Sequence, residues 1–135
     1  WRCPYYVQSI DVESRTARTI TNATHAVAYD GTLYLCYSAT DWATYETTNT
    51  FFTYDVATAT LSNQSFLKGD TVEIASNSVY MMEVNPKNGE LYIGLAGNKF
   101  VSSGVIHRFE KDGTPIHRFD VQGPNPNQAA FVNYQ

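Results

Sequence analysis

The feature that most constrains the fold is a hairpin that recurs along the chain. Three times, a strand-like run ends in an acidic residue, a short turn follows, and a second strand-like run begins. The first runs end at Asp11, Asp55 and Glu110. Internal similarity of this kind is typical of repeat architectures, in which each unit buries its apolar face against its neighbours.

Two further hairpins lie between these three. One joins residues 26–29 to 33–36 through Asp30-Gly31, and the other joins residues 79–84 to 91–95 through a turn that ends in Asn88-Gly89. Asp-Gly and Asn-Gly favour hairpins because the turn needs positive φ. The chain therefore has about four strands in every 45 to 55 residues, which is roughly the size of one β-propeller blade.

Composition supports an all-β protein, because β-branched and aromatic residues outnumber strong helix formers. We predict a partial β-propeller of about two and a half four-stranded antiparallel blades. Residues 1–22 would form the outer strands of one blade, 23–67 and 68–120 two further blades, and 121–135 a terminal closing segment with its strand at 129–133. A propeller has at least about four blades, so the same or another chain would supply the rest of the ring.

Charge and hydropathy exclude two classes of partner. The net charge is −4, and the nine Lys and Arg residues are scattered, so we expect no nucleic-acid partner. No apolar run approaches the roughly 20 residues of a transmembrane helix. The two cysteines, Cys3 and Cys36, form no C-x-x-C motif; a buried free thiol at Cys36 and a Cys3–Cys36 disulfide both stay open.

One stretch resembles a known family. Residues 82–93 read Met-Glu-Val-Asn-Pro-Lys-Asn-Gly-Glu-Leu-Tyr-Ile and are similar to a strand pair of YncE-like β-propellers, particularly the surface lipoproteins of gut bacteria, many of which are domains of unknown function. Residues 104–113, Gln122-Gly123-Pro124 and 129–132 extend the similarity. The resemblance implies the C-terminal portion of a seven-bladed ring, exported to the bacterial cell surface, outer membrane or periplasm.

The turns divide into two groups by length. We expect long loops at 39–49, 68–78, 96–103 and 120–128, and all four would lie on one rim because successive strands alternate in direction. Long loops on a rigid scaffold usually carry function. We therefore predict the ligand-binding surface on this rim.

The long loops combine aromatic, amide and charged side chains. The candidate ligand-binding residues are Trp42, Tyr45, Glu46, Asn77, Asn98, Lys99, Phe100, Asn125 and Gln128. Aromatic platforms with amides suit a neutral or weakly charged ligand such as a glycan, and the resemblance adds a corrinoid as a candidate. The alternative for Trp42 and Tyr45 is packing of their own loop, and for Asn125 it is turn chemistry beside Pro124.

Catalytic motifs are absent from the sequence. It contains no G-x-S-x-G, H-E-x-x-H, P-loop or G-x-G-x-x-G pattern. His25 could line a channel, and we expect His107 and His117 to be half-exposed strand residues, too few for a metal site. We predict a non-enzymatic binding protein with no catalytic residue, metal or cofactor. The alternatives are an interaction scaffold for another surface protein, and a lyase or lactonase of the propeller type.

Overall fold

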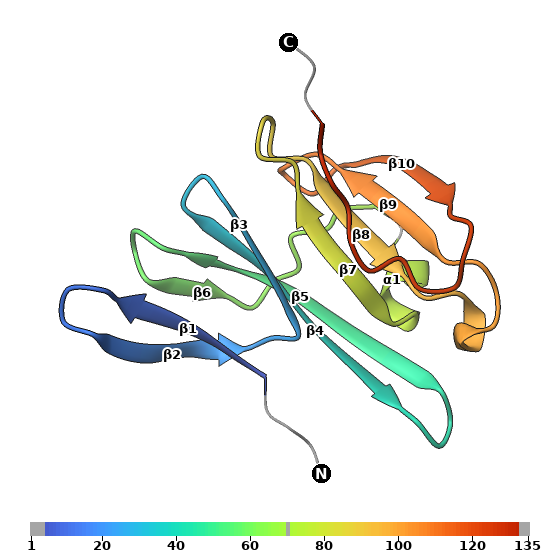
Figure 1. The fold of residues 1–135 in the computed structure, drawn as a ribbon, viewed down its shortest axis with the longest axis horizontal. Helices are drawn as coiled ribbons and strands as arrows, with labels where there is room; N and C mark the ends of the chain where they lie inside the picture. The colour runs from blue at the N-terminus through green and yellow to red at the C-terminus, as the bar shows by residue number, and fades with distance from the viewer. Residues whose placement is uncertain (1–4, 70, 133–135) are drawn as a thin grey trace.

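The computed structural model describes residues 5–69 and 71–132, which form three antiparallel sheets (Figure 1). The first sheet pairs β1 (Tyr6–Asp11) with β2 (Thr16–Asn22). The second is a meander of β3 (His25–Tyr29), β4 (Thr32–Asp41), β5 (Glu46–Asp55) and β6 (Thr60–Ser62). The third is a meander of β7 (Val79–Val84), β8 (Leu91–Leu95), β9 (Val105–Phe109) and β10 (Pro115–Asp120). The all-β prediction is confirmed, and no described sheet closes on itself.

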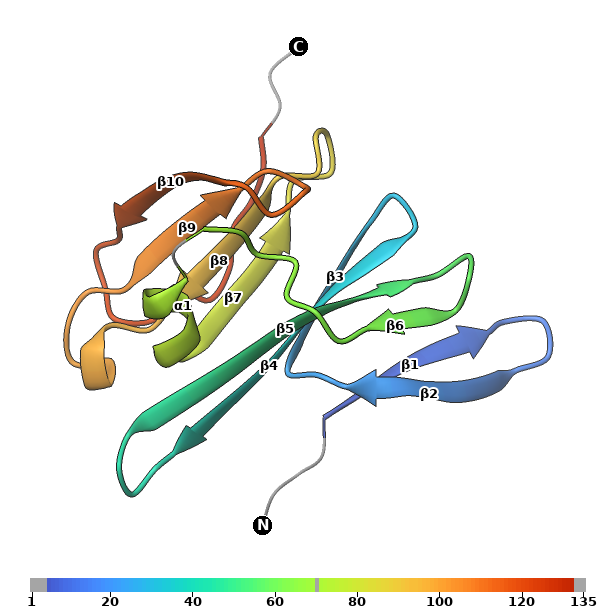
Figure 2. The same ribbon diagram turned by 180° about the vertical axis from the view of Figure 1, so that it is seen from behind.

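Two short helices connect strands at one end of the molecule. The α-helix α1 (Val72–Ser76) precedes β7, and the 3₁₀ helix η1 (Asn98–Phe100) joins β8 to β9. Both views of the ribbon place these helices and the β4–β5 turn toward the same end (Figures 1 and 2). No helix in the described part of the chain is long and apolar enough to cross a membrane.

Two core clusters bury the opposite faces of the β4–β5 pair. On one face Leu35 and Phe52 pack with residues that include Val7 and Ile20 of the β1–β2 sheet. On the other face lies a larger cluster that reaches the third sheet: Tyr34, Cys36, Phe51, Leu67, Ile74, Val79, Met82, Leu91, Ile93, Leu95, Val105 and Phe109. Neighbouring strand residues point to opposite faces, so one sheet serves both clusters. The three sheets therefore pack face to face in chain order.

The expected loop at 39–49 is wrong, because β4 continues to Asp41 and β5 begins at Glu46. What remains is a four-residue turn of a kind that occurs three times. Asp11, Asp41 and Asp55 each accept a hydrogen bond through Oδ1 from a backbone N–H of the turn that follows. The fourth turn residue is left-handed in each case, with φ of 57°, 60° and 53° at Arg15, Tyr45 and Ala59. An aspartate that caps its own turn makes a long connection unnecessary.

Two other strand predictions need correction. In the recurring hairpin that contains Asp55, the sequence predicts the second strand at residues 60–67. The strand ends at Ser62, because the chain then turns inward and buries Leu67 in the larger core cluster. No strand forms at 129–132; Asn133 lies outside the described residues. The chain from Gly123 onward crosses the face of the third sheet, and so it does not lie beside an edge strand with which it could pair.

The C-terminal segment lies over the third sheet, with backbone hydrogen bonds to two loops and a ring contact with β8. The Pro124 carbonyl accepts a hydrogen bond from the Gly97 N–H at 2.8 Å, and the Gly123 carbonyl accepts one from the Gly104 N–H at 2.7 Å. Further along, the Phe131 ring lies 5.1 Å from the Tyr92 ring of β8. The segment therefore covers a sheet face and does not extend a sheet edge.

Candidate functional site

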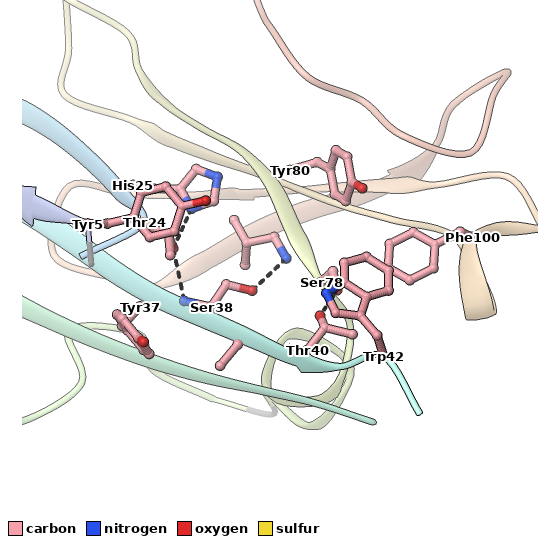
Figure 3. Close-up of a pocket in the computed structure, with 12 residues that line it drawn as sticks. Tyr5, Thr24, His25, Tyr37, Ser38, Thr40, Trp42, Ser78, Tyr80 and Phe100 are labelled. Carbon is pink, nitrogen blue, oxygen red and sulfur yellow. Dashed lines mark hydrogen bonds between the residues drawn. The ribbon is translucent and has the colours of Figure 1, made fainter. Parts of the chain in front are cut away.

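A pocket of about 480 Å³ lies where the second and third sheets meet (Figure 3). Its lining comes from Tyr5, the start of β3, the second half of β4, the start of β7 and η1. The volume falls within the range of roughly 300 to 1,000 Å³ that is usual for small-molecule sites. Both four-stranded sheets contribute walls, so the pocket depends on how they pack together.

Four aromatic rings form a row along one wall. The Trp42 ring stacks on the Phe100 ring of η1, with centroids 5.4 Å apart. Tyr45 meets Trp42 edge-on at 6.5 Å, and Tyr80 of β7 meets Phe100 at 5.9 Å. Stacked and edge-on pairs are the favoured aromatic geometries. The row therefore joins the β4–β5 turn of one sheet to η1 and β7 of the other.

The backbone that positions Phe100 in this row has an uncommon left-handed conformation. Lys99 and Phe100 both have positive φ, 48° and 64°, which is uncommon for residues other than glycine. The turn is held by the Phe100 N–H, which donates to the Gly97 carbonyl at 2.8 Å, and by the Asn98 N–H, which donates to Ser102 Oγ at 2.7 Å. Strained backbone is often found where a side chain must be presented for binding.

The opposite end of the pocket is polar. Thr24 Oγ1 accepts a hydrogen bond from the Ser38 N–H at 2.9 Å and lies 3.0 Å from His25 Nδ1. Burial lowers the pKa of His25 below its usual 6.5, because a desolvated imidazolium is disfavoured. The imidazole at this end is therefore neutral at pH 7.

Three hydroxyl groups connect the sheets beneath the aromatic row. Ser78 Oγ lies 2.6 Å from Thr40 Oγ1 and 2.9 Å from Thr47 Oγ1, and the two threonine oxygens are 2.8 Å apart. Each hydroxyl both donates and accepts, so a closed group of three can satisfy itself. This group fixes the start of β7 against the β4–β5 hairpin and so sets the width of the pocket.

Helix α1, which ends at Ser76 just before Ser78, is bonded to β5 and to the third sheet. Asn49 Nδ2 donates to the carbonyls of Ile74 and Asn77, both at 2.6 Å. Glu73 accepts two hydrogen bonds from Arg118, at 2.9 and 3.0 Å, and its Oε2 lies 2.9 Å from His107 Nε2. The contact with Arg118 lowers the pKa of Glu73, because it favours the carboxylate. These contacts anchor the chain just before Ser78 enters the pocket.

The structure brings three of the nine candidate residues together. Trp42 and Phe100 line the pocket, and Tyr45 packs against Trp42. The other six do not line it: Glu46, Asn77, Asn98, Lys99, Asn125 and Gln128. Asn77 instead bonds α1, since its Nδ2 donates to the Glu73 carbonyl at 2.9 Å. The part that these six play in binding stays a prediction.

Sequence reasoning missed most of the polar lining. Thr40 and Ser78 stood in stretches interpreted as long loops, Ser38 stood between the strand predicted at 33–36 and the loop predicted at 39–49, and Tyr80 stood in a strand interpreted as structural. A usable signal was present, since Ser38, Thr40 and Trp42 alternate with Ala39 and Asp41 as the residues of one strand face do. His25 was identified as a channel candidate and lines the pocket.

The other singled-out residues have structural partners. His107 lies opposite Arg118 in the β9–β10 register, while His117 lies opposite Arg108. Within residues 5–69 and 71–132, no group of three or more His, Cys, Asp or Glu is placed to hold a metal ion. Cys36 is a buried free thiol whose pKa is raised by burial to about 12, and Cys3 lies outside the described residues.

Neither a scan of protein-family models nor a search of curated proteins finds a match to this chain.

Proposed function

We propose that this chain is part of a β-propeller that binds a neutral small molecule in the pocket between its two four-stranded sheets. The observation that carries the proposal is the chemistry of the pocket wall. The described lining residues supply aromatic rings, hydroxyl groups and one imidazole, and none of them is Asp, Glu, Lys or Arg. A charged ligand would lose hydration there without gaining an opposite charge, whereas a neutral one loses little.

The aromatic row gives the pocket an open platform. Trp42 is covered on one side by Phe100, yet the residue is 65% exposed. An exposed indole held rigid by stacking has little conformational entropy left to lose when a ligand covers it. Rigid aromatic anchors of this kind are where binding energy tends to concentrate.

The packing of the sheets supports the propeller part of the proposal. Each of the two larger sheets is a four-stranded meander, as in a propeller blade, and the two sheets pack face to face. The resemblance of residues 82–93 to YncE-like propellers points to the same architecture and to an exported bacterial protein.

Ligand binding can be tested with a mixed panel of compounds and three variants. The panel contains neutral sugars, cyanocobalamin and short uncharged peptides together with acidic and basic sugars and peptides of similar size, and isothermal titration measures binding to the 135-residue chain. Trp42→Ala and Phe100→Ala should each weaken a detected ligand by about tenfold, the effect of roughly 1.4 kcal/mol. Phe119→Ala is the matched control, because Phe119 is an aromatic residue of β10 that stacks on His117 outside the pocket.

Two results would contradict the proposal. Unchanged binding by both pocket variants would place the ligand elsewhere, and equal weakening by Phe119→Ala would indicate a general loss of structure. A panel in which acidic or basic compounds bind more tightly than neutral ones would refute the argument from the lining.

A further inference from the structure

The two ends of the pocket differ in chemistry and lie well apart. Ser38 N–H bonds Thr24 at the polar end, whereas Trp42 begins the aromatic row at the other end. Both residues belong to the same hairpin, four positions apart, with β4 extended up to Asp41. At about 3.3 Å per strand residue, the ends are separated by roughly 13 Å. A single sugar ring is shorter than this and cannot reach both ends.

We infer that the pocket binds a neutral oligosaccharide that lies along β4, with one ring against Trp42 and another beside His25 and Ser38. This inference rests on the proposed function and specifies its ligand class. A pyranose ring carries a face of C–H bonds, and the electron-rich face of an aromatic ring attracts such weakly positive hydrogens. The open side of Trp42 provides that surface.

The polar groups suit sugar hydroxyls in particular. A sugar hydroxyl both donates and accepts, and its natural partners are groups that do the same or that complement it. No hydrogen bond to another described residue occupies the phenol hydroxyl of Tyr80, which lines the pocket (Figure 3). At the other end the phenol hydroxyls of Tyr5 and Tyr37 line the pocket beside His25, whose own ring contacts Thr24 Oγ1 and the Tyr80 backbone. Hydroxyl-bearing rings along the whole length of a ligand would meet a partner at each step.

Chain length is the variable that tests this inference. Neutral gluco-, manno- and galacto-oligosaccharides of one to six units, immobilised as an array, are probed with the fluorescently labelled chain, and hits are measured in solution by titration. Affinity should rise by about tenfold or more from one unit to three, as each added ring gains its own contacts, and then level off once both ends are filled.

Two variants separate the ends of the pocket. A single unit occupies the polar end, so Trp42→Ala should weaken trisaccharide binding by about tenfold and leave the weak binding of a single unit unchanged. His25→Phe keeps a ring of similar size but loses the contacts with Thr24 and the Tyr80 backbone that order the polar end, and it should weaken binding at every length. Phe119→Ala serves again as the control that should change neither series.

Three outcomes would overturn the inference. Equal affinity for one and three sugar units would show that one ring fills the site. If Trp42→Ala weakened binding equally at every oligosaccharide length, the rings would not be arranged along β4 as inferred. Binding of no glycan at any length would reject the ligand class. In that last case a non-glycan hit from the compound panel that responds to Trp42→Ala and Phe100→Ala would still leave the proposed pocket function intact.

Discussion

Two glycines in similar turns allow a sharp test of how tightly the second and third sheets are joined. Gly31 and Gly113 both have positive φ, 74° and 84°, and each carbonyl accepts a backbone N–H at 2.9 Å, from Val56 and Lys68 respectively. They differ in their surroundings. A Cβ at Gly31 would meet no atom within 4 Å, whereas a Cβ at Gly113 would overlap the Phe66 carbonyl oxygen.

The expected losses follow from this difference. Left-handed backbone disfavours alanine by about 1 to 2 kcal/mol, and both Gly31→Ala and Gly113→Ala incur that loss of unfolding free energy. Only Gly113→Ala must also push away the Phe66 backbone, which adds roughly 1 to 3 kcal/mol as overpacking does. At about 3 to 5 °C per kcal/mol for a domain of this size, Gly113→Ala should melt roughly 3 to 15 °C below Gly31→Ala.

The comparison needs only equilibrium unfolding. Thermal denaturation followed by circular dichroism gives the melting midpoint of each variant, and equal slopes in urea denaturation would show that the unfolded states are comparable. The segment that Phe66 begins leads through Lys68 to α1 and then to Ser78 in the pocket. Equal midpoints for the two variants would refute the reasoning, because they would show that this segment yields without loss of stability.

Three further predictions concern single side chains. Burial lowers the pKa of His25 and His107 below 6.5, so the unfolded chain binds more protons than the folded chain just below that pH. The free energy of unfolding should therefore fall as the pH drops from 7 to 5. A pH series of urea titrations should show a smaller fall for His25→Phe than for the unaltered chain. Cys36, with its pKa raised to about 12, should resist maleimide at pH 7.5 until denaturant is added, as peptide mapping would reveal. Asn49→Ala removes two hydrogen bonds to backbone carbonyls and should lower the unfolding free energy by about 1 to 3 kcal/mol, with faster amide exchange in α1.

The hairpins were predictable because their signals are local. Alternating side chains and the Asn-Gly turn predicted β7 and β8 with the bounds observed. The predicted strand ends at Asp11 and Glu110 lie within one residue of the ends of β1 and β9. The residues around Trp42 were misread, although Asp41 begins its turn as Asp11 and Asp55 do. The aromatic residues Trp42 and Tyr45 favoured the interpretation as a binding loop, although the aspartate at position 41 is typical of a short turn.

The pocket was less predictable because it depends on contacts between sheets. Trp42 and Phe100 are 58 positions apart in sequence, and nothing local indicates that they stack. The sequence likewise does not indicate that the Ser78 hydroxyl bonds the hydroxyls of Thr40 and Thr47, because Ser78 precedes β7 of the third sheet and the two threonines belong to the second. Composition predicted aromatic rings and polar partners near one another, but only the packing of β4 against β7 selects which of them meet.

Strand β1 has a consequence for handling the protein. Within the described residues it pairs only with β2, and Ile10 on its outer side is 71% exposed while Val12 in the following turn is 82% exposed. An unpaired strand edge with apolar side chains is a template for edge-to-edge association, and β1 carries no lysine or proline to oppose it. We therefore expect concentrated solutions of this chain to self-associate through β1 and Ile10→Lys to reduce that association, as sedimentation of the two proteins would measure.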